Sequence, residues 1–518
     1  MLRAIGARLS VSGEELKVHA PRGALTPEIK RAIQDHRAEL LGWLRVTTPA
    51  APTPGPARQS YPLSHNQRQL WFEQQLRREA SHYNVPIIMG IGSSATIESV
   101  EQALRSVMAR YDVLRARFPV RGDTPVMEIQ SEAPFALSIV DLPNGTGDAE
   151  RRALIEFLLR PFDLSEGPVF RACVVRSDNG DRTLAVSLHH IVADGWSMGI
   201  LLRDFQRAYI AIESGSPFPP IDLPSLSYGD FSIWQMESER RQGGGPLLES
   251  ARAMLSGAPS LALLYDFPRP EEPTHRGGIC AASLSGDELD RLSAIARQCG
   301  VTVFTLFAAA YAVMLYHESG QEFFAIGTDV AGRDDPAWER VVGHFVNQIV
   351  MAVDLSGNPT LGESIGRASN AFLRAHALRH VPFDMLVKAV RERGEERRPL
   401  FAVKIVMQPP LEDSLKLPGF RMLEIRDGGC KFDLLLNVWF AGDGAQLAIE
   451  YSRDVFADAT GGRLLQELLD VLRSMRIDTL SERLFDLDER LSKTGRVRSR
   501  MPGRFSFSRP AAALGRTQ

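Results

Sequence analysis

Two adjacent histidines, His189 and His190, are the side chains in this sequence best placed for catalysis. Histidine has an unperturbed pKa of about 6.5, so a neutral imidazole is available as a general base at neutral pH. Neighbouring residues of an extended chain face opposite sides, and we therefore expect one of the two rings to reach a site. Asp194 and Gly195 follow closely. The stretch predicts a rigidly mounted catalytic base.

The same stretch also offers a nucleophile. Residues 195–199 (GWSMG) satisfy the G-x-S-x-G pattern of a nucleophile elbow, in which Ser197 would serve a thioesterase or esterase. An elbow serine follows its strand directly, whereas residues 189–194 intervene here, and no HGGG-type segment occurs. The alternative is that Ser197 caps the following helix. No metal site is expected, because adjacent histidines diverge and no second ligand cluster is present.

Local sequence patterns predict the elements that hold these residues. Residues 184–188 form an apolar run rich in β-formers, which predicts a buried strand that delivers the two histidines to its end. Asp194-Gly195 predicts a turn, because glycine tolerates backbone angles that other residues avoid. A helix should follow, since apolar residues recur at helical spacing: Trp196, Ile200, Leu201, Phe205 and Tyr209.

Length and charge limit the possible classes of protein. The chain has 518 residues, enough for two or three domains, and a net charge of −3, which argues against dedicated nucleic-acid binding. Four cysteines without CxxC spacing predict a reducing compartment, with neither disulfide nor metal framework. We find no signal peptide and no apolar run long enough to span a membrane, so we expect a cytoplasmic protein without membrane contact.

Composition divides the chain into five parts. Residues 1–46 are a small separate unit, and residues 47–59 are a Pro/Ala-rich linker. Residues 60–225 and 226–488 are expected to be two α/β lobes, because helices and strands alternate there without a regular βαβ period. Residues 489–518 are a basic tail that we expect to be disordered. Attraction to an acidic carrier protein and an inert solvated segment are both open for this tail.

The amino-terminal unit predicts a β-hairpin followed by a helix. Ser12-Gly13 separates two alternating segments, and Thr26-Pro27 opens a helix that should continue to Leu44. The unit resembles the β-hairpin docking domains that open some nonribosomal peptide synthetase subunits, which implies that it receives the carboxy-terminal peptide of an upstream subunit. Eight Lys or Arg against five Asp or Glu favour an acidic peptide. The candidate docking residues are Leu9, Val11, Leu16, Lys17 and Val18.

Residues 60–475 resemble the condensation domains of nonribosomal peptide synthetases. His189 to Gly195 is similar to their HHxxxDG signature, and six other blocks occur in the same order as in that family: residues 63–72 (LSHNQRQLWF), 160–168 (RPFDLSEGP), 228–234 (YGDFSIW), 326–333 (IGTDVAGR), 342–347 (VGHFVN) and 381–387 (VPFDMLV). The resemblance implies two chloramphenicol-acetyltransferase-like lobes in a V-shaped pseudo-dimer. It also implies a tunnel with carrier proteins at its two mouths.

The resemblance assigns roles to the residues of the site. It implies that His190 faces the tunnel and that His189 packs away from it. Asp194 is implied to pair with Arg333 and so to join elements of the two lobes. The alternative is that its negative charge raises the pKa of His190 and orients the ring. Two further catalytic candidates, one a backbone donor to an oxyanion and one a contact to the acyl or acceptor group, are Gly195 and Asn347.

The function implied is that of a free-standing condensation enzyme. It would transfer an acyl chain from a carrier-protein phosphopantetheine thioester to an amine or hydroxyl, in nonribosomal peptide or hybrid polyketide biosynthesis. The acceptor would be carrier-bound or a soluble small molecule, in which case the step releases the chain. The chain itself is expected to bind no cofactor, because the partner carrier supplies the phosphopantetheine arm, and to be a monomer. Alternatives are a Ser197-dependent thioesterase or esterase and a non-catalytic docking scaffold.

Overall fold

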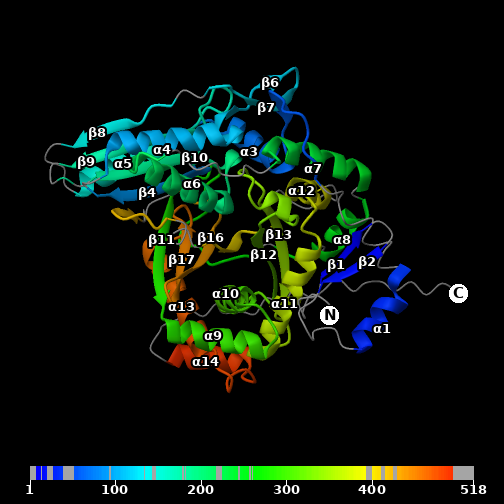
Figure 1. Cartoon of the computed structure of the whole chain (residues 1–518). Coiled ribbons are helices and arrows are strands. Elements are labelled where there is room, and N and C mark those ends of the chain that lie inside the picture. Colours follow the sequence, from blue (N-terminus) through cyan, green and yellow to red (C-terminus); the bar gives the residue numbers. More distant parts are fainter. Residues whose placement is uncertain are drawn as a thin grey trace.

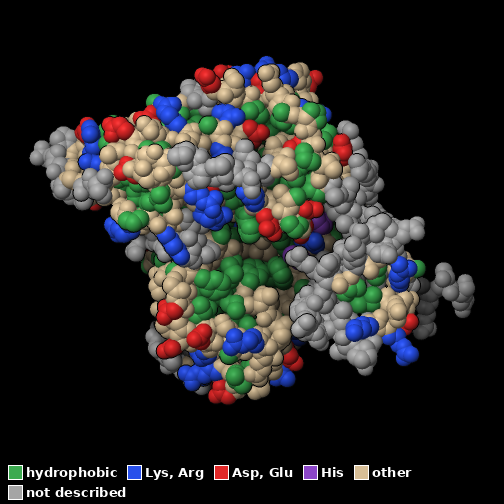
Figure 2. All heavy atoms as spheres, viewed as in Figure 1, with side chains coloured by type: hydrophobic (Ala, Val, Ile, Leu, Met, Phe, Trp, Pro, Cys, Tyr) green, Lys and Arg blue, Asp and Glu red, His purple; other side chains and the backbone are tan. Residues whose placement is uncertain are grey.

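The structure is a computed structural model of the whole chain, in which two α/β lobes lie one above the other (Figure 1). Figure 2 shows that the molecule is hollowed between the lobes and that hydrophobic side chains gather on the lower wall of the hollow. The predicted α/β class is confirmed. The structure describes residues 8–12, 15–19, 27–38, 52–92, 95–132, 135–142, 147–177, 180, 182–216, 225–242, 245–255, 258–259, 261–391, 399–409, 415–423 and 429–493.

The first lobe is built on a five-stranded sheet with the order β15-β4-β10-β9-β8. Its strands are β4 (Asn84–Ile91), β8 (Ser138–Leu142), β9 (Phe170–Ser177), β10 (Arg182–His189) and β15 (Phe420–Met422). The predicted strand over residues 184–188 is confirmed as the middle of β10, which pairs with β4 on one side and β9 on the other. All five of these residues are buried, because the central strand is covered on both faces.

Helices and short elements cover the first sheet. The α-helices are α3 (His65–Leu76), α4 (Ile97–Arg110), α5 (Gly147–Leu159) and α6 (Gly195–Glu213), and the 3₁₀ turns are η2 (Asp112–Arg115) and η3 (His190–Val192). A second small sheet has the order β3-β7-β5, with β6 also paired to β7. Its strands are β3 (Ser60–Pro62), β5 (Ala116–Arg117), β6 (Val120–Arg121) and β7 (Thr124–Ile129). The helix predicted after Gly195 is confirmed as α6.

The second lobe repeats this plan with a six-stranded sheet in the order β11-β17-β16-β14-β12-β13. Its strands are β11 (Gly277–Leu284), β12 (Phe323–Val330), β13 (Asn347–Asp354), β14 (Val403–Met407), β16 (Leu434–Ala441) and β17 (Gly444–Ser452). Its helices are α9 (Gly286–Gln298), α10 (Val303–Ser319), α11 (Leu361–Ala377), α12 (Phe383–Arg391), α13 (Asp458–Ser474) and α14 (Leu484–Lys493), with the 3₁₀ turn η4 (Pro336–Trp338). Residues 305–316 of α10 are buried on every side, as expected of an apolar core helix.

Three segments pass between the lobes, so a boundary at residue 225 does not separate the hydrophobic cores. Helix α7 (Tyr228–Gln242) leads to α8 (Gly245–Leu255), yet Tyr228 and Phe231 of α7 belong to the core of the first lobe. Residues 338–345 join the same core, and β15 extends the first sheet by pairing with β4. The two lobes are therefore interlocked, because each crossing buries aromatic or β-paired residues of one lobe in the other.

The amino-terminal unit contains the predicted hairpin, formed by β1 (Arg8–Ser12) and β2 (Glu15–His19). Its antiparallel register places Leu9 opposite Val18 and Val11 opposite Leu16. Helix α1 spans Pro27–Asp35. Residues 39–44 of the predicted helix, and the basic tail beyond residue 493, lie outside the described residues.

We compared the described helices with the length and apolarity that a membrane-spanning helix needs. No single helix among the described residues is both long enough and apolar enough to cross a membrane. Helices α9 and α10 meet these requirements only when taken together, and that pair is bent by 98°.

Candidate functional site

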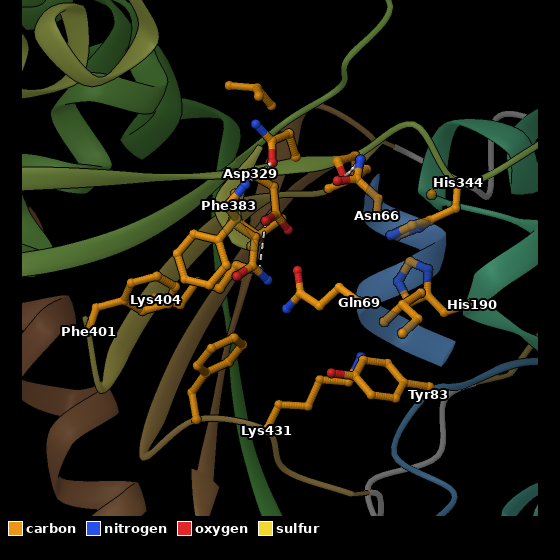
Figure 3. Close-up of a pocket in the computed structure, with 18 of the residues that line it drawn as sticks. Asn66, Gln69, Tyr83, His190, Asp329, His344, Phe383, Phe401, Lys404 and Lys431 are labelled. Carbon is orange, nitrogen blue, oxygen red and sulfur yellow. Dashed lines mark hydrogen bonds and ion pairs between the residues drawn. The ribbon is translucent and has the colours of Figure 1, made fainter. Parts of the chain in front are cut away.

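The end of β10 presents His190 to the space between the lobes. The strand ends at His189, and the chain then turns through η3. The backbone N–H of His190 donates to the carbonyl of Tyr83 over 2.8 Å, which ties this turn to the start of β4. His190 is half-buried, and its ring faces the cavity drawn in Figure 3. The fold thus gives the ring a fixed position at the end of a central strand.

A single hydrogen bond fixes the tautomer of His190. Its Nδ1 lies 2.8 Å from the carbonyl oxygen of Ala193. A carbonyl oxygen only accepts, so Nδ1 must carry the proton in this bond. In the neutral ring Nε2 is then left with a lone pair, which is the state that a general base requires.

The surroundings of His190 keep its imidazole neutral. Burial lowers the pKa of His190 well below its usual value, and the neighbouring His344 and Lys431 lower it further. The charge of Asp194 acts in the opposite direction but is outweighed. The sequence had left open that Asp194 tunes the pKa of His190; in the structure burial dominates instead.

His189 lies on the other face of the strand and is fully buried. Its Nδ1 accepts from the backbone N–H of Ile191 over 3.1 Å, and its Nε2 lies 3.4 Å from Oε1 of Gln74. The ring packs edge-on against Phe162. Its role is therefore to pack and to hold the start of η3.

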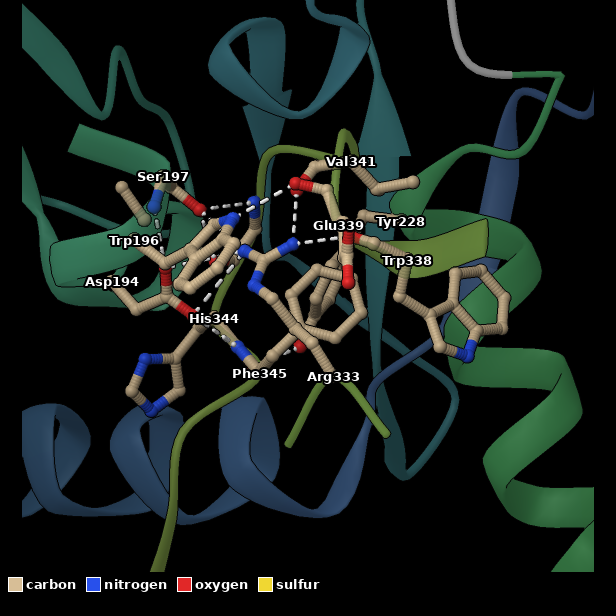
Figure 4. A network of polar contacts seen from close by, with 12 residues as sticks. Asp194, Trp196, Ser197, Tyr228, Arg333, Trp338, Glu339, Val341, His344 and Phe345 are labelled. Atoms are coloured by element: carbon tan, nitrogen blue, oxygen red, sulfur yellow. Dashed lines mark hydrogen bonds and ion pairs between the residues drawn. The ribbon is translucent and has the colours of Figure 1, made fainter. Parts of the chain in front are cut away.

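Asp194 and Arg333 form a buried ion pair, 3.2 Å between Oδ1 and Nη2 (Figure 4). Asp194 also caps α6 by accepting from the N–H of Ser197, and accepts from the N–H of Phe345 over 3.0 Å. Arg333 stacks on the ring of Phe345 with its guanidinium carbon 4.0 Å from the centroid, and donates to the carbonyls of Trp338 and Val341. The pair joins the start of α6 to the loops that follow β12, so its role is structural.

Ser197 is not a nucleophile in this structure, and the esterase hypothesis is wrong. Its side chain is fully buried. The hydroxyl donates to the carbonyl of Gly343 over 2.8 Å and accepts from the N–H of Gly343 and from Nη2 of Arg333. A covalent nucleophile needs access to substrate and an adjacent base, and this hydroxyl has neither. Ser197 is also not the helix cap, since Asp194 takes that position.

Gly195 is the first residue of α6 and lines the cavity. The turn that the sequence predicted at Asp194-Gly195 is instead a helix start, so an unusual backbone angle is not the reason for glycine here. A Cβ at Gly195 would lie 3.4 Å from Cδ of Pro409 and 3.5 Å from Oε1 of Gln408. The small residue therefore keeps the helix amino terminus close to this loop of the second lobe.

Asn347, predicted to contact the acyl or acceptor group, uses its amide on the protein itself. Nδ2 donates to the carbonyls of Arg379 over 2.9 Å and Val381 over 2.8 Å, and Oδ1 accepts from the N–H of Phe383 over 3.3 Å. A side chain whose donors are both occupied by backbone cannot bind a substrate with them. We correct this assignment: Asn347 positions the loop that carries Phe383 into the cavity wall.

The cavity between the lobes has a volume of about 970 Å³. This is within the size range of small-molecule sites, roughly 300–1,000 Å³. The first lobe contributes Asn66, Gln69, Tyr83 and His190 to its wall, and the second contributes Asp329, Phe383, Lys404 and Lys431 (Figure 3). Sequence reasoning had placed only His190, Gly195 and Asn347 here. Asn66, Gln69 and His344 lie within recognised blocks and could have been found there, whereas Lys404 and Lys431 carry no motif signal.

Two ammonium groups enter the cavity wall from the second lobe. Nζ of Lys404 lies 2.7 Å from Oδ1 of Asp329 and so is paired. Nζ of Lys431 lies 4.2 Å from the centroid of the Tyr83 ring, a cation–π contact. Burial lowers the pKa of Lys431 to about 8, with the nearby Lys404 contributing in the same direction. The cavity therefore combines apolar rings with a small number of charged groups.

The predicted docking residues lie on the two paired strands β1 and β2. Leu16 and Val18 are half-buried. The side chains of Leu9, Val11 and Lys17 lie outside the described residues. Among the described residues no group of three or more His, Cys, Asp or Glu is suited to hold a metal ion.

The chain is similar to proteins of known class. Residues 57–484 match the Condensation domain family, and residues 1–45 match the TubC N-terminal docking domain. A chondramide synthase of Chondromyces crocatus is 32% identical over 437 residues, which is 83% of this chain and 11% of that protein. The chain spans about a tenth of the length of the curated relatives it matches.

Solved structures show the same fold. The X-domain from teicoplanin biosynthesis superposes with a TM-score of 0.74 at 25% identity, over 83% of this chain and 98% of that one. The EpoB cyclization-docking bidomain of Sorangium cellulosum superposes with a TM-score of 0.73 at 19% identity, over 93% of this chain and 98% of that one. Since the family match covers most of the sequence, and the fold and the histidine site agree with it, the chain belongs to the condensation-domain family of acyltransferases and carries an amino-terminal docking domain.

Proposed function

We propose that this protein transfers an acyl chain from a phosphopantetheine thioester on a carrier protein to an amine or hydroxyl acceptor. The observation that carries the proposal is the 2.8 Å contact of His190 Nδ1 with the carbonyl oxygen of Ala193, at the wall of a cavity that both lobes line. This contact leaves Nε2 with the lone pair that a base needs. Related synthases that match most of this chain support a place in nonribosomal peptide or hybrid polyketide biosynthesis.

In this reaction His190 takes a proton from the acceptor as the acceptor attacks the thioester carbonyl. The C–N or C–O bond forms, the C–S bond then breaks, and the carrier thiolate receives the proton from the His190 imidazolium. An α-amine has a pKa of about 8 and is readily available as the neutral nucleophile. A hydroxyl keeps its proton at neutral pH and depends more on a general base. Loss of the His190 imidazole should therefore impair ester formation more than amide formation.

The test is the His190→Ala variant in a transfer assay read by intact mass of the acyl-loaded carrier. Acceptors should include amines and alcohols, each offered free and on a carrier protein. We expect the variant to lose a factor of about 10² to 10⁴ in kcat. A non-catalytic docking scaffold would leave the acyl carrier unchanged with the unaltered protein as well, and that result would overturn the proposal.

We further propose that residues 1–46 recruit the donor carrier through the carboxy-terminal peptide of its synthase. The docking-domain match and the two-stranded hairpin, whose strands pair with each other among the described residues, support this role. Removing residues 1–46 should raise KM for a carrier-bound donor and leave KM for a small acyl-pantetheine donor unchanged. Equal effects on the two donors would contradict recruitment.

A further inference from the structure

A second histidine, His344, lies in the cavity wall beside the catalytic candidate. Its ring centroid is 4.7 Å from that of His190, and the two rings meet at 78°. His344 is only 8% exposed, yet it borders the cavity, and Figure 3 shows it on the same side as His190. Unlike His190, it lies outside the HHxxxDG segment, at the centre of residues 342–347.

The backbone around His344 is held on both sides by the Asp194–Arg333 network. The carbonyl of His344 accepts from the hydroxyl of Tyr228 over 2.5 Å. The preceding residue, Gly343, bonds to Ser197 through both its N–H and its carbonyl, and the N–H of the following residue bonds to Asp194 (Figure 4). This much support on a loop is typical of a side chain whose position must be fixed.

The ring of His344 is neutral, and its two nitrogens differ. Burial lowers its pKa to about 3, with Lys431 acting in the same direction. Nδ1 is buried and has no hydrogen-bond partner among the described residues. A proton on Nδ1 would be a buried donor without an acceptor, which is costly, so the proton belongs on Nε2. His344 therefore offers the N–H donor that complements the lone pair of His190.

We propose that Nε2–H of His344 donates a hydrogen bond to the carbonyl oxygen of the acyl group as negative charge develops on that oxygen. The inference rests on the proposed acyl transfer and adds an electrophilic residue to it. His190 removes the proton of the attacking group, and His344 stabilises the oxyanion of the resulting tetrahedral intermediate without transferring its own proton. The oxyanion then reforms the carbonyl, the carrier thiolate leaves, and His190 returns the proton to it.

Three side-chain amides at this wall are already engaged. Nδ2 of Asn66 donates to the carbonyl of Val346 over 2.8 Å, and Nε2 of Gln69 donates to Glu73 over 3.0 Å. The amide of Asn347 holds the loop at residues 379–383. Donation to the oxyanion by His344 thus requires no side-chain rearrangement, which is the condition for effective electrostatic stabilisation of a transition state.

The experiment compares His344→Phe with His344→Gln, which keeps an N–H donor at the end of the side chain. The control is His376→Phe, a half-buried histidine on α11 outside the cavity lining. We expect His344→Phe to lower kcat by a factor of about 10² to 10³, His344→Gln to recover part of that loss, and His376→Phe to behave as the unaltered protein. Circular dichroism verifies that each variant is folded.

A binding measurement separates catalysis from packing. The probes are a pantetheine methylphosphonate, which mimics the tetrahedral oxyanion, and the acetamide of aminopantetheine, which mimics the ground state. His344→Phe should raise the Kd for the phosphonate at least tenfold and change the Kd for the acetamide less than twofold. Equal losses for both probes, or an unchanged kcat, would overturn the role of His344. Absence of transfer by the unaltered protein would instead contradict the proposed function.

Discussion

The molecule buries histidines in two regions whose ionisation differs. In the cavity wall, burial lowers the pKa of both His190 and His344, so these rings are neutral. At the junction of α3, α7 and α12, His65 is 7% exposed, against 8% for His344. Its Nε2 lies 2.6 Å from Oε2 of Glu239, and its Nδ1 lies 3.7 Å from Oδ1 of Asp384. Burial lowers the pKa of His65, but Asp384 and Glu239 together raise it by more.

The comparison shows that carboxylates, and not the degree of burial, decide the charge of these rings. At the cavity wall, where a proton has to move, burial and a nearby ammonium keep the imidazoles neutral. Where elements of the two lobes meet, opposite charges are paired, as in His65 with its two carboxylates and in Asp194 with Arg333. The same residue type is therefore a candidate base in one region and a structural cation in the other.

Arg333→Met should give the largest loss of stability. It leaves the fully buried carboxylate of Asp194 without its partner, and breaking a buried pair in this way costs about 3–5 kcal/mol. Urea unfolding followed by circular dichroism measures the change. Arg105→Met is the matched control, because Arg105 pairs with Glu101 on the surface of α4, where a pair is worth roughly 0–1 kcal/mol. Equal losses in the two variants would refute a structural role for the buried pair.

The neutral histidines should make the protein less stable in acid. The pKa of these rings is lower in the folded state than in the unfolded state, where it is about 6.5. Their contribution to the free energy of unfolding is therefore fully present above pH 6.5, and it is lost as pH falls from 6.5 toward the folded-state pKa. For His344 that window reaches down to about pH 3. As pH falls, protonation of His344 in the unfolded chain should lower the free energy of unfolding by up to about 1.4 kcal/mol per pH unit. The His344→Phe variant should lack this part of the decline. The check is the free energy of unfolding of both proteins at pH 7, 6 and 5; parallel declines would show that His344 does not titrate as inferred.

His65→Gln should show the opposite dependence on pH. The pKa of His65 is raised in the folded state, so its contribution is fully present below about pH 6.5 and is lost as pH rises through the folded-state pKa. At pH 6 we expect a loss of about 1–2 kcal/mol, because a hydrogen bond between charged groups disappears from a partly exposed cluster. The difference between variant and unaltered protein should shrink at pH 9. A difference that grew with pH would contradict a protonated His65.

Much of the fold could be predicted from the sequence, because it depends on local patterns. The strand before His189 and the helix after Gly195 follow from apolar periodicity. The crossing elements could not be predicted, because β15 is only three residues long and joins a sheet whose neighbouring strand is more than 300 residues away. Pairing at such separation depends on the assembled lobes and leaves no periodic signal.

The site was predicted less completely than the fold, and the errors concern hydrogen-bond partners. The nucleophile pattern at Ser197 supported only the alternative function, and that alternative fails because Gly343, 146 residues away, occupies the hydroxyl. Asn347 appears available in sequence, but the loop at residues 379–383 takes its amide. His344 was within a recognised block and was overlooked, since its proximity to His190 arises only when residues 338–345 pack into the first lobe. A motif identifies a residue, whereas its role depends on which groups the fold places beside it.

Lys431→Met should give the smallest effect and tests why the cavity histidines are neutral. The ammonium of Lys431 lowers the pKa of both His190 and His344, after burial. The pKa of Lys431 is lowered only to about 8, so this group is still charged on the acid limb of the activity profile. Its removal should therefore shift the acid limb of kcat/KM to higher pH by less than about one unit. Lys416→Met, an exposed lysine outside the cavity lining, should leave the profile unchanged. An unchanged acid limb in Lys431→Met would mean that this ammonium does not act on the catalytic ring, and burial together with His344 would then account for its neutrality.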